Sequence, residues 1–141
     1  MVNYNGIVGV LVLSLLAGCD SAAPPTGPVG EPKLSWIQVN VFAKSCSNSA
    51  CHGGGASPSG NLSVIDLDTS YANLVGKESG EKKGDGTPMQ RVVPGKPDES
   101  LLYLAVTKGY GNVKQMPLGF PLEPHQIAAI KGWIAAGAKK D

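Results

Sequence analysis

Residues 46–52 read Cys-Ser-Asn-Ser-Ala-Cys-His, and three glycines follow directly at residues 53–55. A disulfide between Cys46 and Cys51 would close a very small loop, so it would constrain little of the unfolded chain. A zinc site would need further ligands, but the chain has only one other cysteine, near its start, and one other histidine. The segment therefore favours another chemistry for the two thiols and the adjacent imidazole of His52.

Two cysteines with a histidine directly after the second are typical of covalent haem attachment. The thiols add to the two vinyl groups at one edge of the porphyrin, and the histidine is held beneath the iron as its proximal ligand. Four residues separate Cys46 from Cys51, where two are usual, but a longer loop leaves His52 in place after the second thiol. Small residues within and after the loop allow the backbone to pass close to a flat macrocycle. The segment predicts one haem c on Cys46 and Cys51, with His52 bound to the iron.

The start of the chain predicts export. Residues 7–17 are almost wholly apolar, a run too short to span a bilayer but of the length found in signal peptides. The four residues that end in Cys19 read Leu-Ala-Gly-Cys and resemble the lipobox of bacterial lipoproteins, in which the cysteine is lipidated and becomes the first mature residue. We expect residues 1–18 to be a signal peptide and residues 19–34 to be a Pro/Gly-rich tether that starts at the lipid on Cys19. The mature protein is then expected on the periplasmic or cell-surface side of a membrane.

Residues 35–141 are expected to form one domain. The whole chain has 12 basic and 11 acidic side chains, and this net charge of +1 argues against nucleic-acid binding. The chain has only eight aromatic side chains (two Trp, four Tyr and two Phe) but 19 glycines and 11 prolines. A core with so few large apolar groups is expected to be small unless a cofactor fills part of it. No Ser-His-Asp, paired-carboxylate or phosphate-loop pattern indicates an enzyme or a small-molecule substrate.

Hydrophobic spacing predicts helices on both sides of the cysteine pair. Ser35 and Gln38 are spaced like a capping box, so a helix is expected to start at Ser35 and to lead into Cys46. Its apolar residues at helical spacing are Trp36, Val39, Phe42 and Ala43, although Val41 so near Val39 also permits a strand. Toward the carboxyl end, Pro97 starts a second helix, and residues 123–138 form a third. The core residues of this last helix are expected to be Ile127, Ile130, Trp133 and Ile134.

The connections between these helices are rich in glycine, proline and charged residues. One helical turn is expected before Gly76, and residues 77–86, which read Lys-Glu-Ser-Gly-Glu-Lys-Lys-Gly-Asp-Gly, are expected to be a solvated loop. Residues 109–122 are long for a connection, and loops of this length in compact domains tend to be functional. This loop contains Met116, directly followed by a proline.

With Met116 ahead of the last helix and the Cys-His pair near the first, the chain resembles the mono-haem cytochrome c domains common in exported bacterial proteins. The resemblance covers residues 36–139 and includes ordered blocks at 92–103, around Met116 and at 127–138. It implies an all-α fold, a small cytochrome c-like helical haem domain with long Gly/Pro-rich loops. It also implies that Met116 binds the iron on the distal side, with His52 on the proximal side.

Iron with two protein ligands has no open position for a substrate, so the resemblance implies an electron carrier and not an enzyme. Its expected partners are redox proteins, together with the membrane through the lipid on Cys19. Met89 and His125 are alternative distal ligands, and an open distal site would instead indicate a haem sensor or a peroxidase-like protein. A surface lipoprotein without haem is the remaining alternative. Arg91 is a candidate partner for a haem propionate, and an ordinary surface arginine is the other interpretation.

Overall fold

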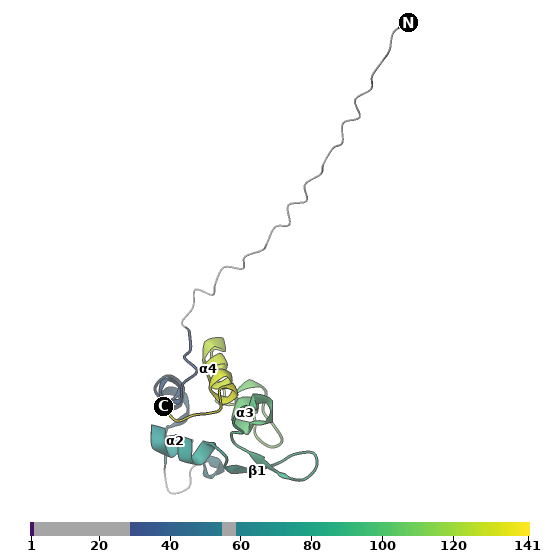
Figure 1. The fold of residues 1–141 in the computed structure, drawn as a ribbon. Helices are drawn as coiled ribbons and strands as arrows, with labels where there is room; N and C mark the ends of the chain where they lie inside the picture. Colours follow the sequence, from purple (N-terminus) through teal and green to yellow (C-terminus); the bar gives the residue numbers. More distant parts are fainter. Residues whose placement is uncertain (2–28, 55–58) are drawn as a thin grey trace.

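The computed structural model describes Met1, residues 29–54 and residues 59–141 (Figure 1). Apart from Met1, the predicted signal peptide lies outside the described residues, as do Cys19 and most of the predicted tether. The described elements are, in chain order, α1 (Leu34–Ile37), η1 (Gln38–Cys46), η2 (Ser59–Asn61), α2 (Leu67–Leu74), β1 (Glu78–Lys82), β2 (Pro88–Gln90), η3 (Pro97–Glu99), α3 (Leu101–Thr107) and α4 (Pro124–Ala135).

The first helical segment consists of α1 and η1, and it is π-helical over η1. It starts at Leu34, so the predicted capping box at Ser35 is wrong. Ser35 lies inside the first turn, where its amide and hydroxyl donate hydrogen bonds of 3.2 and 2.6 Å to the carboxylate of Asp141. Asp141 thereby satisfies one of the amides that a helix start leaves free, and in Figure 1 the C-terminus lies against this helix.

The inward face of this helix differs from the predicted one. Val39 is 62% exposed, whereas Ile37 and Val41 on either side of it are fully buried. The buried apolar residues of the segment are Leu34, Ile37, Val41 and Phe42. Their spacing follows the helical period, whereas Trp36, Val39 and Phe42 recur at every third residue and drift around the helix. Phe42 is buried as expected, but Trp36 is only half-buried at the edge of the cluster.

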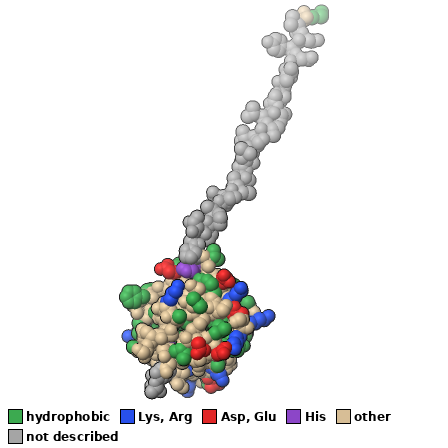
Figure 2. Space-filling model, turned by 90° about the vertical axis from the view of Figure 1, so that its left-hand side faces the viewer, with side chains coloured by type: hydrophobic (Ala, Val, Ile, Leu, Met, Phe, Trp, Pro, Cys, Tyr) green, Lys and Arg blue, Asp and Glu red, His purple; other side chains and the backbone are tan. Residues whose placement is uncertain are grey.

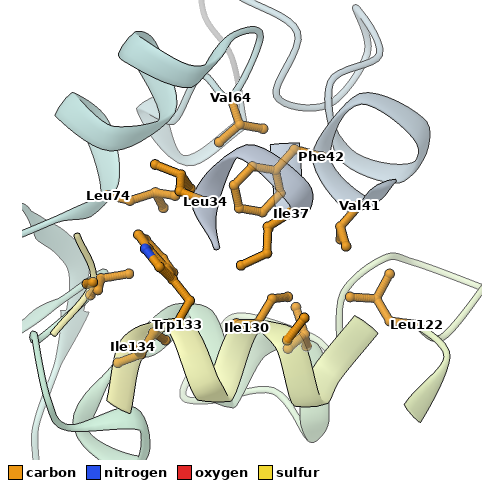
Figure 3. Packing of buried hydrophobic residues seen from close by; sticks show 14 residues of the cluster. Leu34, Ile37, Val41, Phe42, Val64, Leu74, Leu122, Ile130, Trp133 and Ile134 are labelled. Carbon is orange, nitrogen blue, oxygen red and sulfur yellow. The ribbon is translucent and has the colours of Figure 1, made fainter. Parts of the chain in front are cut away.

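The core lies where this first helical segment packs against α4. Figure 3 shows the side chains of Ile130 and Trp133 on α4 facing those of α1 and η1. Trp133 is 2% exposed, and its indole N–H donates a 2.8 Å hydrogen bond to the carbonyl of Lys139. The prediction that Trp133, Ile130 and Ile134 are core residues is confirmed, while Ile127 is half-buried at the edge of the cluster.

The start of α4 is also confirmed, because Glu123 and Gln126 form a capping box in which each side chain binds the other residue's backbone N–H. The helix ends at Ala135, three residues earlier than expected. The helix expected from Pro97 is divided, with the short turn η3 followed by α3. Ser100 separates the two, and its buried hydroxyl accepts a 2.9 Å hydrogen bond from the amide of Val93.

The expectation of an all-α fold is wrong. The described residues form four α-helices and a two-stranded antiparallel sheet, are 42% helical and 11% strand, and make a small mixed α/β fold. β1 lies within the segment expected to be a solvated loop, and it pairs with β2 so that Glu78 lies opposite Gln90. Residues 77–86 have no alternating apolar residues that would indicate a strand. The apolar contact of the hairpin comes from Met89 on β2, which is 3% exposed and packs against Leu101 and Leu104 of α3.

The turn of this hairpin is stabilised by its own polar groups. The carboxylate of Asp85 accepts hydrogen bonds from the amide of Thr87 at 2.9 Å and from its hydroxyl at 2.6 Å. These bonds lower the pKa of Asp85 below its usual value. Asp-Gly at residues 85–86 is a sequence signal for a hairpin turn, and it is the local signal that the loop prediction left out.

The observed face of the first helix predicts which substitutions destabilise the domain. Ile37→Ala removes a fully buried side chain and leaves a cavity, so we expect the free energy of unfolding to fall by about 3 kcal/mol. Val39→Ala changes an exposed position and should alter it by less than about 0.5 kcal/mol. Chemical denaturation of both variants measures the difference. A larger loss for Val39→Ala would contradict the packing described here.

Candidate functional site

A cavity of about 1290 Å³ lies between η1, α3, β1 and the loop that contains Met116. It is larger than the ~300–1,000 Å³ typical of small-molecule sites. Much of its wall is hydrophobic and includes Phe42, Val64, Leu74, Leu101, Ala105 and Val106. A cavity of this size and polarity suits a large apolar group, which would complete a core that the chain's few aromatic residues leave thin.

Both cysteines of the segment at residues 46–52 line this cavity. They are half-buried and are not joined by a disulfide. η1 ends at Cys46, and the loop after it turns back so that the amide of His52 donates a 3.1 Å hydrogen bond to the carbonyl of Cys46. The four-residue spacing is thus closed at its base by one backbone hydrogen bond, which fixes His52 beside the first cysteine.

The glycine after His52 has a different role from the expected one. A β-carbon on Gly53 would overlap the carbonyl oxygens of Ser47 and Asn48. Glycine at this position therefore allows the chain to pass close to its own loop between the cysteines. The expected role, close approach of the backbone to a flat cofactor, is not needed to explain this residue.

The imidazole of His52 also lines the cavity and is held by a backbone group. Its Nδ1 lies 3.1 Å from the carbonyl oxygen of Leu62. Because a carbonyl only accepts hydrogen bonds, we assign the proton to Nδ1, which leaves the lone pair on Nε2 for a metal. A histidine that binds a metal through one ring nitrogen is usually oriented by such a hydrogen bond from its other ring nitrogen. The backbone on both sides of the contact is paired as well, since Val64 donates to the carbonyl of His52 at 3.0 Å.

Met116 lines the same cavity from the loop before α4. It is half-buried, and its amide donates a 2.8 Å hydrogen bond to the carbonyl of Ala105 on α3. The two alternative ligands lie elsewhere and do not line the cavity. Met89 is packed in the core between the hairpin and α3, and the ring of His125 stands edge-on to Trp36 with 6.2 Å between ring centroids. Cys46, Cys51, His52 and Met116 are therefore brought together, and Met89 and His125 are kept apart from them.

Arg91 lines the cavity but is engaged with the backbone. Its guanidinium donates hydrogen bonds to the carbonyl of Asn73 at 2.9 Å and to those of Gly60 and Asn61 at 3.1 Å. Partial burial lowers the pKa of Arg91 from its usual value. The side chain thus joins the end of α2 to η2, next to the segment that holds His52, and it is more than a free surface arginine.

Two features of the site could not be found from the motif. β1 supplies part of the cavity wall, and the loop before α4 places Leu118 and Phe120 at its edge, where they are 61% and 83% exposed. The only sequence signal for the first was the Asp-Gly turn of the hairpin. For the second, the Pro/Gly-rich residues 117–121 predict a loop but do not indicate which of its side chains are exposed.

Comparison with protein-family models, with curated proteins and with solved structures finds no match for this chain. The resemblance to cytochrome c domains therefore stays a prediction from the sequence. Among the described residues, no three side chains of His, Cys, Asp or Glu gather as a metal site. Within the same part of the chain, no helix is long and apolar enough to cross a membrane.

The surroundings of Cys46 make a testable prediction. Burial, with a smaller contribution from Cys51, raises the pKa of Cys46 from its ordinary value of 9.0 to about 11. Only the thiolate is alkylated, so in the folded protein with both thiols free, at pH 8, Cys46 should react with iodoacetamide about a hundredfold more slowly than in urea-denatured protein. Peptide mass spectrometry over time measures both rates. Equal rates in the two states would contradict the burial of this thiol.

Proposed function

We propose that this chain is a mono-haem c-type cytochrome that carries electrons between redox partners. Cys46 and Cys51 would hold the haem covalently, and His52 and Met116 would bind its iron. The observation that carries the proposal is that one large apolar cavity is lined by all four of these residues, although Met116 lies 64 positions after His52 in the sequence.

The residues present fit such a group. The thiols are free to form thioethers, because neither takes part in a disulfide. His52 has its Nδ1 engaged with a carbonyl, so its Nε2 is the nitrogen available to iron. The porphyrin supplies four nitrogen ligands, and the protein has to supply only the two that this cavity offers. The apolar side chains of the wall replace the water that would otherwise surround the macrocycle.

When bound, a haem supplies an iron that changes between the ferrous and ferric states and so carries one electron. The protein sets the balance between these states. A methionine sulfur together with a histidine nitrogen favours ferrous iron and raises the reduction potential. The largely apolar wall lowers the polarity around the group, which disfavours the oxidation state with the greater net charge. With Met116 and His52 both bound, no position is left for a substrate, which supports electron transfer over an enzymatic role.

The proposal includes export and a lipid on Cys19, so that residues 19–34 connect the domain to a membrane. Redox proteins on the periplasmic or cell-surface side are then its partners. Long-range electrostatic steering of these partners should be weak, because the chain has a net charge of only +1. On the face seen in Figure 2, basic and acidic side chains are interspersed.

Intact mass spectrometry of protein from cells that mature c-type cytochromes tests the covalent part. We expect a chain that starts at Cys19 and carries lipid and one haem, and haem staining that survives denaturing electrophoresis. Cys46→Ala combined with Cys51→Ala should remove the haem, while the lipid on Cys19 stays. Free thiols at both positions in the wild type would support a lipoprotein without haem and contradict the proposal.

Met116→Ala tests the distal ligand. Sulfur bound to ferric iron gives a weak far-red absorption band, so the variant should lose this band, bind carbon monoxide rapidly when reduced and have a lower reduction potential. Met89→Leu, which conserves volume in the core, and His125→Gln should change none of the three. Loss of the wild-type spectrum only in His125→Gln would indicate two histidine ligands. Rapid binding of carbon monoxide by the wild type would indicate an open distal site, and a sensor or peroxidase-like protein.

A further inference from the structure

The hairpin is connected to the loop that presents Met116 by side chains of β1 and of the loop itself. The carboxylate of Glu81 accepts a 3.1 Å hydrogen bond from the amide of Asn112. The hydroxyl of Tyr110 donates a 3.3 Å hydrogen bond to the carbonyl of Lys82. Both contacts join neighbouring residues of β1 to one turn of the loop, about 30 positions later in the sequence.

The turn at residues 110–113 leaves room for the carboxylate of Glu81. Tyr110 and Val113 close the turn by two reciprocal backbone hydrogen bonds of 2.8 and 2.9 Å. Between them, Gly111 has a φ of +57°, which favours glycine, and a β-carbon there would overlap the carboxylate oxygen of Glu81. The turn therefore leaves room for the carboxylate, whose charge strengthens its hydrogen bond with the amide of Asn112.

α3 supports both the hairpin and the loop that contains Met116. On one side, Met116 is attached to α3 through the hydrogen bond from its amide to the carbonyl of Ala105. On the other side, the hairpin rests on α3 through the buried side chain of Met89, and the hydroxyl of Ser79 on β1 donates a 2.8 Å hydrogen bond to the carbonyl of Met89. Three contacts hold the turn at the cavity: the bond between Glu81 and Asn112, the bond between Tyr110 and Lys82, and the packing of Tyr110 and Val113 against the cluster around Met89.

We propose that Glu81 is a positioning residue that holds residues 109–116 against the hairpin and thereby keeps Met116 at the cavity. The inference rests on the proposed function, because it concerns how the distal ligand is presented. It assigns to the hairpin a task that neither the cysteine motif nor Met116 itself indicates. Removing the carboxylate leaves the amide of Asn112 to water and lets the turn open more often.

The test compares Glu81→Ala with Glu81→Gln in the full-length, haem-loaded protein. Glutamine keeps an oxygen that can accept the hydrogen bond from Asn112, whereas alanine does not. Loss of a charge-assisted hydrogen bond corresponds to about a tenfold change in the population of the open turn. In Glu81→Ala we therefore expect about tenfold faster exchange of the Asn112 amide hydrogen, about tenfold faster carbon monoxide binding to the ferrous protein and a weaker far-red band. Glu81→Gln keeps the hydrogen bond without the charge, so it should lie between the wild type and Glu81→Ala in all three measurements.

Glu99→Ala is the matched control. Its carboxylate also contacts the hairpin, through Lys83 at 3.9 Å, but it does not touch the loop. It should leave the band and carbon monoxide binding unchanged, because exposed ion pairs contribute little.

Two results would overturn the inference. One is an unchanged Asn112 exchange rate in Glu81→Ala, since the hydrogen bond would then not hold the turn. The other is faster exchange with an unchanged band and unchanged carbon monoxide binding, since the turn would then not position Met116. Failure of the proposed function is a different result, because it shows as a wild-type protein without haem or without the far-red band.

Discussion

Packing of the first helical segment against α4 is the constraint on which the rest of the domain depends. Leu34 and Ile37 meet Ile130 and Trp133 in one buried cluster, and the hydrogen bonds between Ser35 and Asp141 join the two ends of the domain at the same place. From this fixed start, the helix continues through η1 to Cys46. The position of the first cysteine, and with it the base of the cavity, therefore follows from contacts between segments about 100 residues apart.

The opposite wall of the cavity is held by α3. One part of this helix buries Met89 and so carries the hairpin, and its Ala105 carbonyl accepts the hydrogen bond from the Met116 amide. Apolar packing holds the hairpin through Met89, and Tyr110 and Val113 of the loop pack against the same cluster. The backbone hydrogen bond to Ala105 and the contact between Glu81 and Asn112 add polar links to this packing.

Two methionines of similar local sequence context have different surroundings in the structure. Both lie next to a proline, at residues 88–89 and 116–117, and both are flanked by polar or glycine-rich segments. Met89 points into the core between the hairpin and α3, and Met116 lines the cavity. The same holds for the two histidines, since Leu62 orients His52 and His125 stands against Trp36. The surroundings of each side chain in the fold therefore distinguish the candidate ligands His52 and Met116 from His125 and Met89.

The sequence by itself determined the features that depend on neighbours along the chain. These are the two cysteines with an adjacent histidine, the start of the last helix at Glu123, and the apolar face of α4, because each is set by spacings of one to four residues. The tertiary structure alone decided the burial of Ile37 in place of Val39, the hairpin within a charged segment, and the contact of that hairpin with the loop before α4. Each of these depends on contacts between segments far apart in the sequence, whose packing energies outweigh the local preferences of the residues involved.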